Sequence, residues 1–237
     1  MDVRQELISL CTPVMNRLDD LRLTMPLRII AANESPPVEI LILDCGSKDG
    51  LQEYMDELME STRLVRGNFI TYKRIERDYW HTAKAHNMGM MLGQGEYVVD
   101  LMADALIHHG YIPNIRDLID EGCIWGRARH YCGNKWIKKS EFIDAGGYDE
   151  RMELYGPDDR DLDYRLVLRG GKFGLIEDDL INEIRTQDDK KVANYRIKGS
   201  KHELSKQMRQ YYDENRQGGV LVANLGRSWG NWDEHLF

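Results

Sequence analysis

Short apolar segments alternate with helix-length segments over the first hundred residues of this chain. Residue patterning predicts strands at 7–12, 38–44, 65–73 and 96–102 and helices at 16–30, 51–60 and 82–92. The segment 38–44 is apolar nearly throughout, as expected of a parallel strand that is covered on both faces. Strands that alternate with helices pair in parallel through right-handed crossovers. The sequence therefore predicts an α/β fold with a doubly wound, mostly parallel sheet.

The second half of the chain is less regular. Helices are expected at 112–120 and 138–145, an extended segment at 123–131, and short strands at 172–176 and 180–184. We place the main domain at residues 1–185. Residues 186–237 have little apolar content and include a polar helix at 202–216. This pattern predicts a helical C-terminal extension that is mobile or dependent on a partner.

Composition limits the classes of partner. With 237 residues and 42% hydrophobic content, the chain can bury one full core. Its net charge of −8 disfavours a polyanionic partner, although a local basic patch would still permit one. The amino end lacks a basic and apolar leader, and no apolar run approaches the roughly 20 residues of a membrane span. We therefore expect a cytoplasmic protein without a membrane span.

The four cysteines show no paired metal-binding spacing. Cys11, Cys45 and Cys123 each lie beside an apolar run. Cys132 is the fourth cysteine. This distribution predicts reduced, buried thiols in preference to disulfides or zinc ligands.

An acidic cluster stands at the start of a predicted helix. Asp158, Asp159, Asp161 and Asp163 place four carboxylates within six residues. Helix N-termini stabilise negative charge, so ordinary capping accounts for part of the cluster. It accounts less well for Asp158 and Asp159, which follow a Tyr-Gly-Pro turn. From such a rigid corner, a carboxylate can project into a cleft and accept a proton from a hydroxyl.

A second acidic position, Asp104, follows the predicted strand at 96–102. Ligands of open α/β sheets bind beyond the carboxyl ends of the strands, where Asp104 would meet a metal-bound phosphate. The alternative is that Asp104 merely caps the next turn.

Five motifs follow one another in an order that resembles glycosyltransferase family 2 over residues 7–177. They are TPVMNR at 12–17, LDCGSKDG at 43–50, KAHNMG at 84–89, GEYVVDLMAD at 95–104 and DDRDLDYR at 158–165. The resemblance implies a GT-A fold, with a nucleotide-binding half at about 1–105 and a smaller acceptor-binding lobe at about 106–185. It also implies a nucleoside diphosphate sugar donor, usually UDP-linked.

The resemblance assigns roles residue by residue. Asp104 matches the second carboxylate of an Asp-x-Asp motif and would hold Mn²⁺ or Mg²⁺ against the diphosphate. Asp159 would be the general base of an inverting transfer to a hydroxyl acceptor, with Asp158 beside it. The expected donor-binding residues are Thr12, Pro13, Asn16, Arg17, Asp44, Ser47, Asp49, Lys84 and Asn87.

The chain departs from the pattern at two metal positions. Met102 stands where the first carboxylate of Asp-x-Asp is expected, and Asp100 is the nearest spare carboxylate. Relatives often place a metal-binding histidine after the acidic helix. The nearest histidine here is His202, which is either a ligand or a solvated surface residue.

Two alternatives to transfer onto a glycan or other hydroxyl acceptor stay open. The acceptor could be a hydroxylated DNA base, whose footprint would be a basic cluster of Lys135, Lys138, Lys139 and Arg151. Alternatively, the loss of a carboxylate at Met102 could mark a nucleotide-sugar-binding module without catalysis. The sequence specifies neither the sugar, nor the acceptor, nor the oligomeric state.

Overall fold

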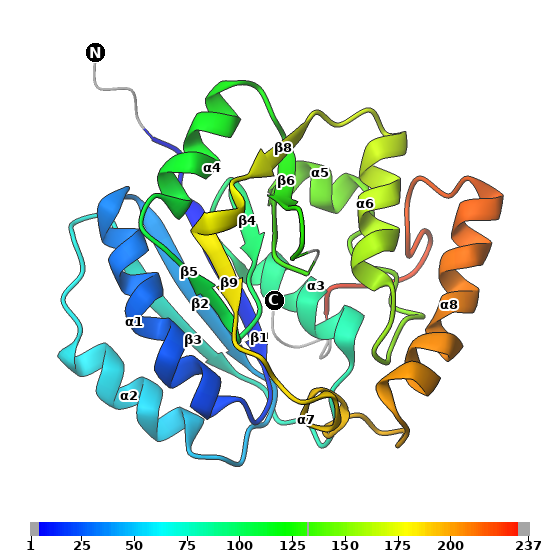
Figure 1. The fold of residues 1–237 in the computed structure, drawn as a ribbon, viewed down its shortest axis with the longest axis horizontal. Helices are drawn as coiled ribbons and strands as arrows, with labels where there is room; N and C mark the ends of the chain where they lie inside the picture. Colours follow the sequence, from blue (N-terminus) through cyan, green and yellow to red (C-terminus); the bar gives the residue numbers. More distant parts are fainter. Residues whose placement is uncertain (1–4, 132, 232–237) are drawn as a thin grey trace.

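The computed structural model describes residues 5–131 and 133–231 and confirms the α/β class (Figure 1). A seven-stranded sheet has the order β3-β2-β1-β4-β7-β6-β8, and β5 pairs with β9 in a second, two-stranded sheet. The strands are β1 (Ile8–Val14), β2 (Val38–Asp44), β3 (Phe69–Arg74), β4 (Tyr97–Asp100), β5 (Ala105–Ile107), β6 (Trp125–Ala128), β7 (Lys135–Lys138), β8 (Phe173–Ile176) and β9 (Ile181–Glu183).

Helices cover both faces of the large sheet. In Figure 1, α1 lies in front of the sheet and α3 behind it, as a doubly wound arrangement requires. The helices are α1 (Leu18–Glu34), α2 (Leu51–Ser61), α3 (Thr82–Leu92), α4 (Tyr111–Asp120), α5 (Lys139–Asp144), α6 (Asp158–Leu168), α7 (Asp188–Val192) and α8 (Lys201–Gly218), with a 3₁₀ turn η1 (Asp178–Leu180).

The first four strands of the large sheet form its parallel part. β1 pairs in parallel with both β2 and β4, and β2 pairs in parallel with β3. Every residue of β1 and β2 is buried, which explains why their sequences are apolar with little alternation. Because the strands run in one direction, their carboxyl ends meet at one edge of the sheet, and the polar residues that follow them gather there.

The remaining strands complete the sheet in mixed directions. β7 runs antiparallel to both β4 and β6, and β8 runs parallel to β6. Sequence patterning predicted no strand at 135–138, because lysines stand at both ends of this four-residue strand. Its centre, Trp136 and Ile137, is fully buried.

The described part of the C-terminal segment packs against the rest of the chain. Leu204 and Met208 of α8 are buried in a cluster with Met152 and Leu154. α8 lies beside α6 in Figure 1. Each buried aliphatic side chain contributes about 1.5–3 kcal/mol to folding. A narrow apolar face on a polar helix was enough to dock it, and average composition concealed that face.

The thiols follow the prediction where they are described. Cys11, Cys45 and Cys123 are free and buried, whereas Cys132 lies outside the described residues. Within residues 5–131 and 133–231, no helix has the length and apolar character needed to cross a bilayer.

Candidate functional site

One pocket opens where the polar ends of several elements meet. Residues after β1 and β4 contribute to its wall, as do the start of α6 and the segment from β9 to Tyr195. Its acidic residues are Asp100, Asp104, Asp158, Asp159 and Glu183; its basic residues include Arg17, Lys190 and Lys191; its aromatic residues are Trp80, Tyr148, Tyr155 and Tyr195. The pocket thus combines charge of both signs with apolar ring faces.

Asp104 lies between β4 and β5, with 5% of its surface exposed. Its Oδ2 accepts a hydrogen bond from Nη2 of Arg17 at 3.0 Å and another from Oγ1 of Thr186 at 3.3 Å. Glu183 lies alongside, because β9 pairs with β5 and the amide of Ile184 donates to the carbonyl of Asp104 at 2.9 Å. Two carboxylates and a guanidinium therefore share this side of the pocket.

Asp158 and Asp159 begin α6 on the other side of the pocket. Asp158 is 9% exposed, and burial together with the charge of Asp159 raises its pKa to about 7. Asp159 is half-buried, and its Oδ1 accepts from the amide of Arg160 at 2.7 Å. The first turn of α6 thus presents two adjacent carboxylates, of which the buried one holds its proton up to near neutral pH.

A buried polar chain lies behind the acidic pair. Nδ1 of His86 is 2.8 Å from Oδ1 of Asp100, and the hydroxyl of Tyr148 donates to Oδ2 of Asp100 at 2.6 Å. Burial opposes the charged form of His86, but the carboxylate of Asp100 outweighs it and raises the pKa of the imidazole. Asp100 is therefore committed to these partners and not free to replace the carboxylate missing at Met102.

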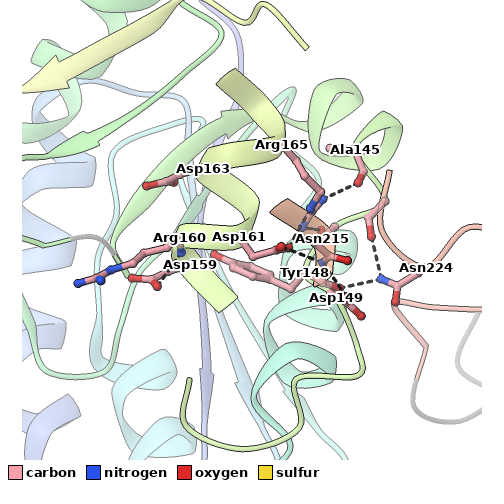
Figure 2. A network of polar contacts seen from close by, with 12 residues as sticks. Ala145, Tyr148, Asp149, Asp159, Arg160, Asp161, Asp163, Arg165, Asn215 and Asn224 are labelled. Atoms are coloured by element: carbon pink, nitrogen blue, oxygen red, sulfur yellow. Dashed lines mark hydrogen bonds and ion pairs between the residues drawn. The ribbon is translucent and has the colours of Figure 1, made fainter. Parts of the chain in front are cut away.

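The opposite side of α6 anchors the helix (Figure 2). Arg165 bonds to Asp161 at 2.9 Å, and both side chains are fully buried. Nδ2 of Asn215 donates to Asp161 at 2.8 Å and to Asp149 at 2.9 Å. Figure 2 shows Asp159 and Asp163 pointing away from this network. One helix therefore carries a structural acid on one side and the pocket acids on the other.

Aromatic residues link the pocket wall to the C-terminal segment. Trp80 forms a parallel bridge with Tyr195, and its amide donates to the carbonyl of Asn194 at 2.8 Å. The hydroxyl of Tyr195 lies 2.6 Å from Oγ1 of Thr82. Residues beyond 185 are thereby built into the pocket.

Comparison with known families decides the assignment. The family model described as "Glycosyl transferase family 2" matches residues 9–184. The chain belongs to glycosyltransferase family 2. No curated protein sequence matches it.

Solved structures show that this family 2 chain has the GT-A fold. The mannosyltransferase PcManGT from Pyrobaculum calidifontis, in complex with GDP-Man and Mn²⁺, matches with a TM-score of 0.59 and 17% identity, over 74% of this chain and 56% of that one. TarS 1–349 of S. aureus with UDP-GlcNAc gives 0.65 and 12%, over 81% and 62%. GalNAc-T7 with UDP, GalNAc and Mn²⁺ gives 0.66 and 14%, over 90% and 48%. This chain thus spans about half to three fifths of each of these proteins.

The structure brings five of the predicted site residues of this glycosyltransferase chain to the pocket wall. They are Pro13, Arg17, Asp104, Asp158 and Asp159. The remaining predicted donor residues do not line it.

Several of those residues shape the loops beneath the pocket. Oγ of Ser47 accepts from the amide of Asn16 at 2.9 Å, and Asn16 in turn accepts from the amide of Lys48 at 2.7 Å. Asp49 accepts from the amide of Leu18 at 2.8 Å and so caps α1. Asn16 has a positive φ of 54°, and its Nδ2 bonds Asn194, a residue of the pocket wall.

Thr12 and Asp44 are fully buried toward the carboxyl ends of β1 and β2. Thr12 accepts from Nη1 of Arg28 at 2.5 Å. Oδ2 of Asp44 accepts from the hydroxyl of Tyr72 at 2.8 Å and from Nη1 of Arg74 at 2.5 Å. The nucleobase of a donor could hydrogen-bond to this oxygen of Asp44 only if Tyr72 and Arg74 moved.

Lys84, Asn87 and His202 also lie away from the pocket wall. Asn87 is fully buried, where it bonds the amide and the carbonyl of Tyr148 at 2.7 and 2.9 Å. Lys84 is half-buried in α3, and His202 is exposed on α8. The structure does not bring His202 to the side of the pocket where Asp104 lies.

Sequence reasoning missed the contribution of residues 183–195. Glu183, Lys190, Lys191, Asn194 and Tyr195 all line the pocket. The one available signal was the adjacent pair of lysines after the last predicted strand, which polar composition led us to assign to the extension.

Proposed function

We propose that this chain transfers a sugar from a nucleoside diphosphate donor, UDP-linked in the first instance, to a hydroxyl acceptor with inversion at the anomeric carbon. The observation that carries the proposal is that Asp104 and Asp159 line one pocket. Membership of glycosyltransferase family 2 and the nucleotide-bound structural neighbours support the same chemistry.

The donor diphosphate fits the side of the pocket that carries positive charge. Arg17, Lys190 and Lys191 line it, and each can offer a charge-assisted hydrogen bond to a phosphate oxygen. As the bond between the sugar and the diphosphate breaks, negative charge accumulates on the leaving group. These cations would stabilise that charge in place of bulk water.

The residues present also fit a divalent ion, if the donor supplies part of its coordination. Asp104 and Glu183 are neighbours across β5 and β9, and carboxylate oxygens suit Mn²⁺ or Mg²⁺. Among the described residues, no group of three His, Cys, Asp or Glu side chains could hold a metal ion. Two carboxylates with substrate phosphates and water make up an ordinary Mg²⁺ site. Such an ion would neutralise the departing diphosphate.

Asp159 acts as the general base in this proposal. Its carboxylate takes the proton of the acceptor hydroxyl as that oxygen forms the new bond to the anomeric carbon. The diphosphate leaves from the opposite face with the electron pair of the old bond, which inverts the configuration. Aromatic faces at Trp80, Tyr155 and Tyr195 offer surfaces on which sugar rings can stack.

Thermal denaturation with a donor panel tests the donor assignment. The panel contains UDP-glucose, UDP-GlcNAc, GDP-mannose and a CDP- and a dTDP-sugar, each with MnCl₂ or with EDTA. A ligand at about 100 times its Kd adds roughly 2.7 kcal/mol to stability, which is readily measured. Arg17→Ala and Asp104→Ala should weaken the response to the stabilising nucleotide, while Asp179→Ala, on an exposed turn, should not. No shift with any member of the panel would refute the proposal.

A binding module without catalysis is the second candidate, because Met102 replaces a carboxylate and Arg17 already pairs with Asp104. Release of UDP from UDP-GlcNAc, or from whichever donor stabilises the chain, separates the two candidates. Turnover that disappears in Asp159→Asn supports the transferase. Tight binding with no turnover, whichever metal and acceptor are offered, supports the module.

The basic footprint expected for a DNA acceptor does not form a free patch. Lys135 is fully buried, and Lys138 pairs with Glu96 at 3.2 Å. Lys139 donates to two main-chain carbonyls, and Arg151 pairs with Asp149 at 2.6 Å. We therefore do not propose a DNA acceptor.

A further inference from the structure

Lys135, at the start of β7, carries a completely buried ammonium group next to the acidic helix. Its Nζ donates to the main-chain carbonyl of Asp159 at 2.7 Å and to Oδ1 of Asp163 at 2.6 Å. The same nitrogen lies 5.8 Å from the ring centroid of Tyr148. A buried ammonium is costly unless it is paired and hydrogen-bonded, so its position is strictly specified.

Neutralising Asp163 does not by itself account for this lysine. Nε of Arg127, on β6, already bonds Oδ2 of Asp163 at 2.8 Å. Arg127 and Lys135 therefore hold the two oxygens of one carboxylate from neighbouring strands. Lys135 also donates to the backbone of Asp159, which joins it to the first turn of α6.

We propose that Lys135 is a positioning residue for catalysis, which holds the first turn of α6 through the Asp159 carbonyl and supplies a buried positive charge behind the two pocket carboxylates. The inference rests on the proposed role of Asp159. Asp163, one helical turn after Asp159, orients the ammonium. Asp159, the proposed general base, is thereby tied to the central sheet. Its position then does not depend only on the end of a helix, which tends to fray.

The electrostatic surroundings support this role. Burial and the Asp159 charge disfavour the ionised form of Asp158, whereas His86 and Lys135 favour it. The charged and titratable groups that face the acidic pair come from α3, β4, β7, the segment before α6 and the segment after α7. They are His86, Asp100, Lys135, Tyr148, Tyr155 and Tyr195. Of these, Lys135 and protonated His86 are the cations. Loss of Lys135 should therefore make Asp158 harder to ionise.

Three variants separate position, charge and fold: Lys135→Met removes the cation, Lys135→Arg keeps charge but changes its reach, and Arg127→Met removes the other cation on Asp163. Circular dichroism and thermal unfolding establish that each variant folds. UDP release from UDP-GlcNAc with MnCl₂ is measured against pH. Titration of ¹³C-labelled aspartate carboxyls by NMR is measured in parallel and needs no activity.

For Lys135→Met we expect kcat to fall about 10- to 100-fold, because a displacement near 1 Å at the reacting group has effects of that size. KM for the donor should stay within about twofold. The NMR titration of Asp158 should move to higher pH, because one of the charges that favour its ionised form is lost. Lys135→Arg should keep the titration of Asp158 but lower kcat, and Arg127→Met should keep both near wild type.

If Lys135→Met and Arg127→Met behave alike in kcat and in the NMR titration, Lys135 is a structural residue and the proposal fails. Should Lys135→Met not fold, Lys135→Arg decides: unchanged kcat and an unchanged titration overturn the proposal. If the wild type releases no UDP while the titration still shifts in Lys135→Met, the proposed function fails and the electrostatic role survives. If the wild type releases UDP but the titration does not shift in Lys135→Met, the proposed function survives and the electrostatic role of Lys135 fails.

Discussion

The half of the chain up to residue 105, which we propose as the donor side, and residues 106–185, which we propose as the acceptor side, hold their pocket residues in different ways. In the donor-side half, Pro13 lies near the carboxyl end of the buried strand β1 and Asp104 follows β4, and the core beneath them is apolar. In the acceptor-side half, α6 is fixed by buried charges such as Lys135 and Arg165. In the first arrangement the strands rest on hydrophobic burial, and polar pairs such as Arg17 with Asp104 lie at their ends. In the second, ion pairs with both side chains fully buried, such as Arg165 with Asp161, hold the helix. We therefore expect the two halves to respond differently to single substitutions.

The largest effect should come from Asp159→Asn. Removing a general base typically costs about 10²–10⁴ in kcat, and donor affinity should change little because the amide keeps the shape of the side chain. UDP release and UDP affinity by calorimetry check this expectation. Asp179→Asn, on an exposed turn, is the control. Retention of most activity in Asp159→Asn would show that Asp159 is not the base.

Arg165→Met tests whether buried charge holds the acceptor-side half. It leaves Asp161 buried without its ion-pair partner, so the free energy of unfolding should fall by about 3–5 kcal/mol. Arg169→Met removes looser contacts, at 3.6 and 3.9 Å, from the same helix and should cost less than about 1 kcal/mol. Urea unfolding measures both. Equal losses would show that the buried ion pair of Arg165 does not hold this helix more strongly than more exposed charge does.

Asp158→Asn should stabilise the protein at pH 8. Because the pKa of Asp158 is raised in the folded state, the folded chain binds more protons than the unfolded chain between about pH 4 and 7. Wild-type stability should therefore decline as pH rises through this window, and the variant should lack this decline. We expect a gain of about 1–3 kcal/mol at pH 8 and little gain at pH 4. A wild-type stability that rises across this window, with no gain in the variant, would contradict the assignment.

The smallest effect should come from the donor-side half. Asp49→Ala removes the cap on the Leu18 amide and should cost about 0.5–2 kcal/mol in unfolding free energy. Because Asp49 does not line the pocket, UDP affinity should stay within about twofold. Calorimetry with UDP decides the point. A large loss of affinity would restore Asp49 to the donor-binding role expected from the sequence.

This contrast also explains what the sequence could reveal. Strands and helices of the first half follow from apolar periodicity, and Asp104 and Asp159 were found because motifs keep their spacing. Asp44 and Asn87 carry the expected motifs yet are occupied by internal hydrogen bonds, which no spacing discloses. Lys135 and Glu183 reach the site through strand pairing between segments distant in sequence. Such pairings depend on the register of the folded sheet, so local patterns do not report them.

The link from Asn215 to Asp161 has a consequence for the order of events during translation. The ribosome releases the chain from its amino end, so Asp161 emerges 54 residues ahead of this amide partner. Lys190, Lys191 and Tyr195 of the pocket wall also emerge after the whole acidic helix. A nascent chain stalled before residue 190 would lack both, so the pocket wall can be completed only after these later segments have left the ribosome.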